Sequence, residues 1–147
     1  LAEEEEARQH RRRRGSVPGH LVIDRNHAAG HARITADYFN DNPVYTYYHF
    51  RRRYRMRRPL FLRIMAAMTQ KDEWFLCRPD ATGKMGLSSF QKCIAPLRIM
   101  AYGLPADAVD DYVCIFEATA TEALNRFCAA VVDVFEEQYL HALQHLM

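Results

Sequence analysis

The sequence lacks lysine throughout its first part. No lysine precedes Lys71, whereas residues 7–68 contain fourteen arginines. It also lacks any apolar run near the eighteen residues that indicate a transmembrane helix. No stretch at its start has the basic, apolar and small-residue order of a secretory signal. We therefore expect a protein that neither spans a membrane nor is secreted.

Motifs of common catalytic sites are absent as well. There is no glycine-rich phosphate loop, no GxSxG and no HExxH. Asp24 follows an apolar run, but one acid cannot hold two divalent metals. The pairs His27/His31 and His141/His145 have the i, i+4 spacing of zinc ligands, yet neither has an obvious third ligand. We expect no enzyme activity, no metal, no cofactor and no small-molecule substrate.

The four cysteines form no CxxC pair and have no histidines near them at zinc-finger spacing. They are Cys77, Cys93, Cys114 and Cys128. Isolated cysteines usually behave as small hydrophobic residues. We expect free, buried thiols.

The net charge of +2 hides a strong asymmetry. Residues 7–68 carry fourteen arginines against three aspartates, a balance of +11. Residues 104–140 carry eight acids against Arg126 alone, a balance of −7. Such halves either serve different partners or pair with each other.

The first residues, "LAEEEEARQHRRRRGSVPGH", have almost nothing to bury. We expect a disordered charged tail and linker over residues 1–32 and a helical domain over residues 33–147. The "RRRR" block is compatible with a nuclear-import signal, which favours a nuclear protein.

Helical patterns fill the rest, and we find no alternating strand pattern. Tyr47, Phe50 and Tyr54 have the spacing of one helical stripe. Pro59 suits the first turn of a second helix. Ser88 with Gln91 predicts a capping box for a third helix, which ends at Gly103. Pro96 lies inside that helix and should kink or destabilise it. The sequence predicts an all-α domain of about five helices.

The last two predicted helices have the layout of a helix-turn-helix. A short helix at 105–113 is followed by a turn and by a helix whose capping box would be Thr119 and Glu122. Thr121, Asn125 and Arg126 would then lie nearest to DNA bases. Any two amphipathic helices joined by a tight turn give this pattern, however. The eight acids of this region would also repel a phosphate backbone.

A second candidate for contact with DNA is the stretch "HFRRRYRMRRPLF". Arginine clusters suit phosphate contact because the guanidinium group offers forked hydrogen bonds. We expect Tyr54 and Met56 to anchor the segment while the arginines point outward. The cluster consists of Arg51, Arg52, Arg53, Arg55, Arg57, Arg58 and Arg63. The alternative is a solvated face that pairs with the acidic half of the chain.

Two segments together resemble a known family. They are "DYFNDNPVYTYYHFRRRYRMRRPLFLRIM" (37–65) and the stretch from "DATGKMGLSSFQKC" through "AYG" to residue 135. They resemble the N-terminal part of plant PIF/Harbinger transposase-derived proteins, often labelled Harbinger-like nucleases. The similarity covers roughly residues 20–140. Phe116 departs from it, because the family usually has glycine in the turn there, and so does Pro96.

The resemblance implies that DNA binding and catalysis belong to different regions of the protein. In that family a helix-turn-helix-like region precedes an RNase H-like nuclease with an Asp-Asp-Glu metal site. This chain lacks that site, so no catalytic residue of the family can be placed on it. A separate Myb-like protein supplies much of the DNA recognition in the family. The implied partners are double-stranded DNA and such a Myb-like protein.

Three hypotheses follow. The first is the non-catalytic, DNA-binding N-terminal region of a Harbinger-type protein. The second is a protein-interaction or self-association module that docks through the acidic helix from residue 120, which would leave Val132, Tyr139 and Leu143 as an uncovered stripe. The third is an inactive transposon remnant.

Overall fold

The computed structural model describes residues 26–146. Within that range all regular structure is helical apart from one isolated β-bridge between Pro79 and Met85, which confirms the expected all-α fold. The expected tail falls largely on residues 1–25, including both charged blocks, which lie outside the described residues. Among the described helices, none is both long and apolar enough to cross a membrane.

Helix α2, His27–Ile34, is the first described element and continues into a π-helical turn, η1, at Thr35–Phe39. The side chain of Asn26 caps α2 by accepting a hydrogen bond from the backbone N–H of Ala29 at 3.1 Å. Ile34 is fully buried in the core. The helical domain therefore starts before residue 33, where we had placed its boundary. Glycine and two histidines in "HAAGHARI" weaken the apolar pattern that would have revealed this helix.

Helices α3, Tyr47–Tyr54, and α4, Arg58–Lys71, follow. Pro59 lies in the first turn of α4 as expected. Phe50 and Tyr54 are buried, but Tyr47 is 79% exposed, so the predicted stripe was wrong at its first member. Helical side chains lean toward the N-terminus, so the side chain of Tyr47, at the first residue of α3, extends past the end of the packed surface.

A 3₁₀ turn, η2 at Glu73–Phe75, and a connector lead to helix α5, Ser89–Tyr102. The predicted capping box is present: the Ser88 hydroxyl accepts from the Gln91 N–H, and the Gln91 side chain accepts from the Ser88 N–H at 2.9 Å. Gly103 ends α5 in the left-handed conformation, with φ 64°. The helix continues through Pro96, which is buried within it.

The last elements are η3 at Ala106–Val109, α6 at Asp110–Val113 and α7 at Glu117–Leu146. The predicted order of short helix, turn and long helix is present. The capping box at Thr119 and Glu122 was wrong, because α7 already begins at Glu117. The Ala120 N–H donates to the Phe116 carbonyl at 2.8 Å, so Thr119 lies inside the helix. Between α6 and α7 it is Cys114 that adopts the left-handed conformation, with φ 57°.

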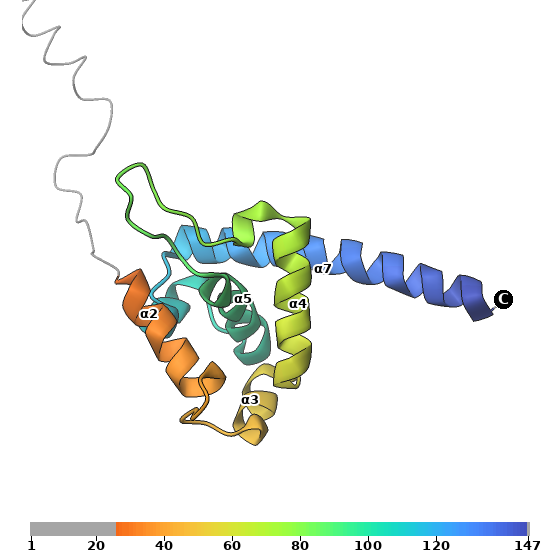
Figure 1. The fold of residues 1–147 in the computed structure, drawn as a ribbon, viewed down its shortest axis with the longest axis horizontal. Coiled ribbons are helices and arrows are strands. Elements are labelled where there is room, and N and C mark those ends of the chain that lie inside the picture. The colour runs from red at the N-terminus through yellow and green to blue at the C-terminus, as the bar shows by residue number, and fades with distance from the viewer. Residues whose placement is uncertain (1–25, 147) are drawn as a thin grey trace, which may run out of the picture.

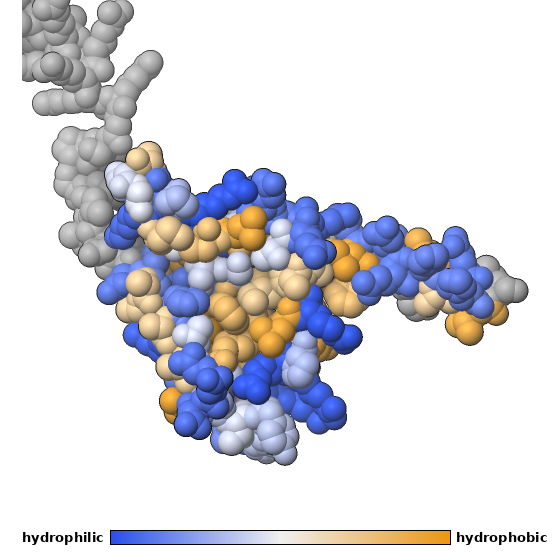
Figure 2. Space-filling model, viewed as in Figure 1, coloured by the Kyte–Doolittle hydropathy of each residue, from blue (hydrophilic) through white to orange (hydrophobic). Residues whose placement is uncertain are grey.

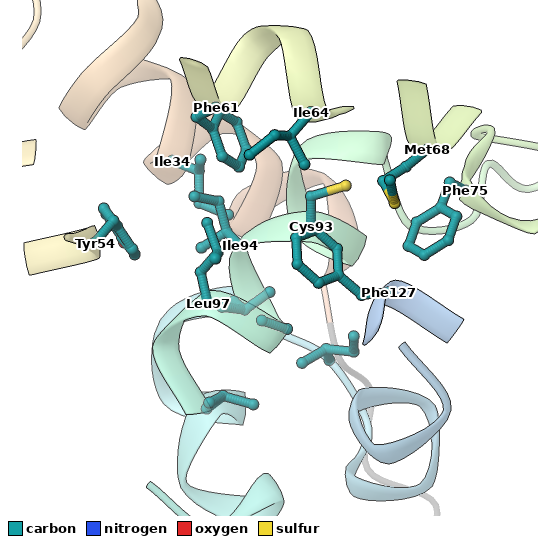
Figure 3. Close-up of a cluster of buried hydrophobic side chains, with 14 of the residues drawn as sticks. Ile34, Tyr54, Phe61, Ile64, Met68, Phe75, Cys93, Ile94, Leu97 and Phe127 are labelled. Atoms are coloured by element: carbon teal, nitrogen blue, oxygen red, sulfur yellow. The ribbon is translucent and has the colours of Figure 1, made fainter. Parts of the chain in front are cut away.

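Helix α5 lies at the centre of the domain and is contacted by α2, α3, α4 and α7. Figure 3 shows side chains from these elements converging, among them Ile34, Phe61, Ile94 and Phe127. Aromatic rings fill one end of the core: the ring centroids of Phe50 in α3 and Phe61 in α4 are 5.7 Å apart. Such ring pairs add about 0.5–1.5 kcal/mol beyond their buried area. They hold the C-terminal half of α3 firmly against the core.

One buried polar group joins three helices. Gln91 of α5 is fully buried, and its side-chain amide donates to the His27 carbonyl at 2.8 Å and to the Val113 carbonyl at 2.9 Å. A Cβ atom added at Gly30 would lie 2.3 Å from the Val113 oxygen. Glycine is therefore required where α2 crosses α6. These contacts fix α2 as part of the helical domain.

Helix α7 has two different halves. Its first half packs on α5, where Ala120, Ala123 and Phe127 are buried. In Figure 1 the second half continues beyond α4 and projects from the body of the molecule. Figure 2 shows hydrophobic side chains among hydrophilic ones on this projecting part. It also shows apolar surface on the face between α2 and α4.

Candidate nucleic-acid interface

Most of the predicted arginine cluster is exposed. Arg51, Arg52, Arg55, Arg57 and Arg63 are exposed, whereas Arg53 and Arg58 are half-buried. We call the first five the exposed arginines. They come from the last turns of α3, from the short connection after it and from α4. Tyr54 is buried and Met56 packs against the core, which confirms that these two residues anchor the segment.

The connection between α3 and α4 depends on an unusual backbone conformation. Arg55 ends α3 with φ 61° and ψ 20°. These angles lie in the left-handed region, which residues other than glycine seldom adopt. Its backbone N–H donates to the Arg51 carbonyl at 2.9 Å, which closes the last turn of α3. The chain then starts α4 three residues later. This tight connection keeps arginines from both helices near one end of the molecule.

Two arginines of the cluster serve the fold. Arg53 donates to the Tyr38 hydroxyl at 2.7 Å, and its guanidinium carbon lies 4.0 Å from the centre of the Tyr45 ring. The hydrogen bond to Tyr38 raises the pKa of Arg53 above its usual value. Arg58 donates to the Tyr38 carbonyl at 2.7 Å. Because Tyr38 is itself buried, these guanidinium groups fasten η1 to the junction of α3 and α4.

The exposed arginines of α3 border two shallow depressions. One, of about 450 Å³, is lined by Tyr48, Arg51, Arg52 and Arg55. The other, of about 530 Å³, is lined by His49, Arg52, Arg53, Arg55 and Tyr102. Arg52 and Arg55 take part in both, so at least three exposed guanidinium groups surround one stretch of surface. Figure 2 shows mainly hydrophilic and intermediate side chains at this lower end of the molecule, around α3.

Sequence reasoning missed Tyr48, His49 and Tyr102 as members of this surface. Tyr48 is 59% exposed and Tyr102 is 45% exposed. Tyr102 comes from the end of α5, far from the cluster in sequence, and no local pattern could have placed it there. Tyr48 and His49 lie on α3 itself, where their position opposite the buried Phe50 and Tyr54 was a usable signal.

The exposed arginines do not pair with the acidic half of the chain in the part that the structure describes. The ion pairs found among residues 26–146 join Arg78 to Glu73 and Arg126 to Asp72 and Glu122. None of them involves an arginine between residues 51 and 63. The alternative of internal pairing therefore receives no support from these residues. The guanidinium groups remain able to bind an external anion.

The start of α7 is less suited to DNA. Arg126 donates to Asp72 at 2.8 Å and to Glu122 at 3.0 Å, and it lies over the Trp74 ring. Arg126 was expected to be available to a base, but these carboxylates already occupy its guanidinium group. The hydrogen bond to Asp72 raises the pKa of Arg126 above its usual value.

Thr121 and Asn125 are exposed, as a base contact would require. The Thr121 hydroxyl, however, donates back to the Glu117 carbonyl at 3.0 Å. In Figure 1, α3 lies at the lower edge of the molecule and the first half of α7 crosses its upper part. The structure therefore does not bring the two predicted groups of DNA-binding residues together into one surface.

Tyrosines and an arginine form a separate half-buried network. Arg98 donates to the Tyr54 hydroxyl at 3.1 Å and lies 4.2 Å from the centre of the Tyr112 ring. Tyr112 donates in turn to the carboxylate of Asp37. Burial raises the pKa of both Tyr54 and Tyr112 above the usual tyrosine value. Both therefore stay protonated: the Tyr54 hydroxyl accepts the hydrogen bond from Arg98 of α5, and the Tyr112 hydroxyl of α6 donates its own to Asp37.

The cysteines follow the prediction only in part. All four are free thiols. Cys93 is buried, and burial raises the pKa of its thiol to about 12. Cys77 and Cys128 are exposed, so the expectation of four buried thiols was wrong. Among residues 26–146, no group of three or more histidine, cysteine or acidic side chains lies close enough to hold a metal ion.

Comparison with known proteins does not identify a function for the chain. A family model described as "Domain of unknown function (DUF8418)" matches residues 30–69, which includes η1, α3 and most of α4. No curated protein matches the chain, and no solved structure matches it. The matched segment contains all seven arginines of the predicted cluster and the tyrosines that anchor it.

Proposed function

We propose that the chain is the DNA-binding N-terminal region of a Harbinger-type transposase-derived protein. It contacts the phosphate backbone of double-stranded DNA through the exposed arginines. One observation supports this most: these five guanidinium groups lie on the surface and form no ion pair with any described carboxylate. Three of them, Arg51, Arg52 and Arg55, line one depression at the end of α3, and Arg52 and Arg55 also line the second.

The chemistry of this surface fits phosphate groups. Each guanidinium offers a planar fork of N–H donors that matches two phosphate oxygens. The hydroxyls of Tyr48 and Tyr102 beside the arginines are further donors of the kind that contacts phosphates. Phosphate contacts give affinity and orientation but little sequence information.

Because phosphate contacts carry little sequence information, recognition of a particular DNA sequence requires contacts from another protein surface. We infer that a Myb-like partner protein supplies it, in keeping with the family resemblance, and that the complex acts in the nucleus. We propose no catalytic role for the described residues. An inactive remnant is the competing proposal, and it predicts no specific interaction with DNA.

The test is a titration of fluorescently labelled duplex DNA with the full chain at several salt concentrations. Each phosphate neutralised contributes a slope of about −0.9 to the plot of log K against log salt. Three to five arginine contacts therefore predict a slope between about −2.7 and −4.5. Binding that does not respond to salt, or no binding at low salt, would contradict the proposal.

A further inference from the structure

Each of the two depressions at the end of α3 joins an exposed tyrosine to exposed arginines. Tyr48 lines the first depression and Tyr102 lines the second, while Arg52 and Arg55 line both. Both tyrosines are exposed. Because the depressions share two arginines, they adjoin each other. Two aromatic rings therefore border one surface whose shared members carry guanidinium groups.

The spacing of residues along α3 places Tyr48 on the same face as the arginines. Arg51, Arg52 and Arg55 follow Tyr48 by three, four and seven residues. Side chains at these intervals lie on one side of a helix. Phe50 is buried in the core instead. The packing of α3 on the core therefore does not account for a large aromatic ring at position 48.

The fold holds the second ring in place. Tyr102 is the last residue of α5, and the guanidinium carbon of Arg98, one turn earlier, lies 5.5 Å from the centre of its ring. Arg98 also donates to the hydroxyl of the buried Tyr54 at 3.1 Å. These contacts connect the ring of Tyr102 to the core. A ring that is already held loses little conformational freedom when a ligand packs on it.

The backbone conformation of Arg55 also indicates a ligand. Glycine adopts a φ of 61° without steric cost, whereas other residues do so at a cost. Residues kept in such conformations cluster at ligand-binding surfaces. This chain has arginine at the position, and Arg55 lines both depressions. We infer that its side chain serves this surface rather than the end of the helix.

Tyrosine rings beside arginines suit nucleotides whose bases are unpaired. In a duplex each base is paired and stacked between its neighbours, so its flat face is not available to a protein ring. An unpaired base can stack on a tyrosine while the phosphates next to it bind guanidinium groups. Such stacking strengthens binding by about fivefold or more for each base. Since every base has a flat aromatic face, this contact does not select a particular sequence.

We propose that this surface binds a short unpaired stretch of DNA, with one base on Tyr48, another on Tyr102, and the phosphates next to them on Arg52 and Arg55. The inference rests on the proposed function, because the same arginines bind phosphate in both. It adds the form of DNA that binds most tightly, which is a duplex that is locally opened. A fully paired duplex would contact the arginines and the tyrosine hydroxyls but not the faces of the rings.

Two labelled DNAs of equal length test the proposal. One is a fully paired duplex, and the other has several adjacent mismatches at its centre. Both contain the same number of phosphates, so their total charge does not distinguish them. The full wild-type chain should bind the mismatched DNA at least about fivefold more tightly than the paired duplex. Fluorescence anisotropy at one salt concentration provides both dissociation constants.

Variants of the tyrosines identify the source of this preference. The double variant Tyr48→Ala and Tyr102→Ala should bind the two DNAs with affinities within about twofold of each other. The double variant Tyr48→Phe and Tyr102→Phe should keep the preference, because the rings stack without their hydroxyls. Tyr47→Ala is the matched control: Tyr47 is an exposed tyrosine of α3 that lines neither depression, so its loss should leave the preference intact. Circular dichroism checks that each variant is folded.

The possible results separate this inference from the proposed function. Equal binding of both DNAs by the wild-type chain would overturn the inference and leave the proposed function standing. No binding of either DNA at low salt would overturn both. A preference that survives the double alanine variant, or one that is lost in the double phenylalanine variant, would overturn the stacking of bases on these two rings.

Discussion

Two regions of this protein carry arginine beside exposed helix surface, and they differ in what the guanidinium groups contact. At the end of α3, Arg51, Arg52 and Arg55 border open depressions and pair with no described carboxylate. At the start of α7, Arg126 is held between Asp72 and Glu122. The guanidinium groups of the first region are available to an external anion. In the second region Asp72 and Glu122 already neutralise the charge of Arg126.

The same contrast exists within the arginine cluster. Arg53 and Arg58 are neighbours of the exposed arginines in sequence, yet both bond to Tyr38. Proximity in sequence therefore does not decide which arginine can contact DNA. What decides it is whether the guanidinium group reaches Tyr38 of η1.

Reversing the charge of the exposed arginines should have the largest effect. The triple variant Arg51→Glu, Arg52→Glu and Arg55→Glu replaces three attractive phosphate contacts by repulsive ones. We expect a loss of roughly 100-fold or more in affinity for duplex DNA near physiological salt. The thermal unfolding midpoint should stay close to that of wild type, because these side chains are exposed. Unchanged affinity would remove the arginines from the proposed interface.

Removing an anchored arginine should affect stability instead. Arg53→Ala leaves the buried hydroxyl of Tyr38 without the donor that now bonds to it and removes the contact with Tyr45. We expect the free energy of unfolding to fall by about 1–3 kcal/mol, measured by urea denaturation. Arg51→Ala is the control and should change it by less than about 0.5 kcal/mol. Equal effects of the two variants would erase the distinction between anchored and exposed arginines.

Arg126→Gln should have a smaller effect. The variant loses the ion pairs to Asp72 and Glu122, both partly exposed, so only a slight decrease in unfolding free energy is expected. Affinity for duplex DNA should not decrease. A clear loss of DNA affinity would instead show that Arg126 exchanges its carboxylate partners for DNA.

Thr121→Ala and Asn125→Ala should have the smallest effect. If the start of α7 reads bases, each lost contact would cost about 1–3 kcal/mol for the preferred sequence. We expect changes below about twofold, because the surrounding acids repel the phosphate backbone. Competition between duplexes of different sequence provides the measurement. A selective loss for one sequence would restore the helix-turn-helix interpretation.

Local patterns in the sequence predicted much of the fold. The capping box at Ser88 and Gln91, the left-handed Gly103 and Pro59 in the first turn of α4 are all present. Each of these depends on residues close together in the chain. The error at Thr119 is of the same kind, since several residues near the start of α7 suit a helix N-terminus and spacing alone cannot choose among them.

The site was less predictable, because it depends on tertiary contacts. The sequence identified the arginine cluster but could not tell that Tyr38, fifteen residues before Arg53, engages its guanidinium group. It could not bring Tyr102 to the end of α3 either. The exposed apolar side of α7 was visible in the sequence, whereas the pocket between α4 and α7 that Ile64, Val134 and Phe135 help to line appears only when both helices are placed.

The most direct test of the central claim compares two variants that lose the same charge at different places. The first is Arg51→Gln, Arg52→Gln and Arg55→Gln, and the second is Lys71→Gln, Arg78→Gln and Lys84→Gln. Their affinities for one labelled duplex are measured at the same salt concentration. If the α3 surface binds DNA, the first variant loses about tenfold or more in affinity and the second stays within about threefold of wild type. Equal losses would show that net charge alone, and not the arginines at the end of α3, determines binding.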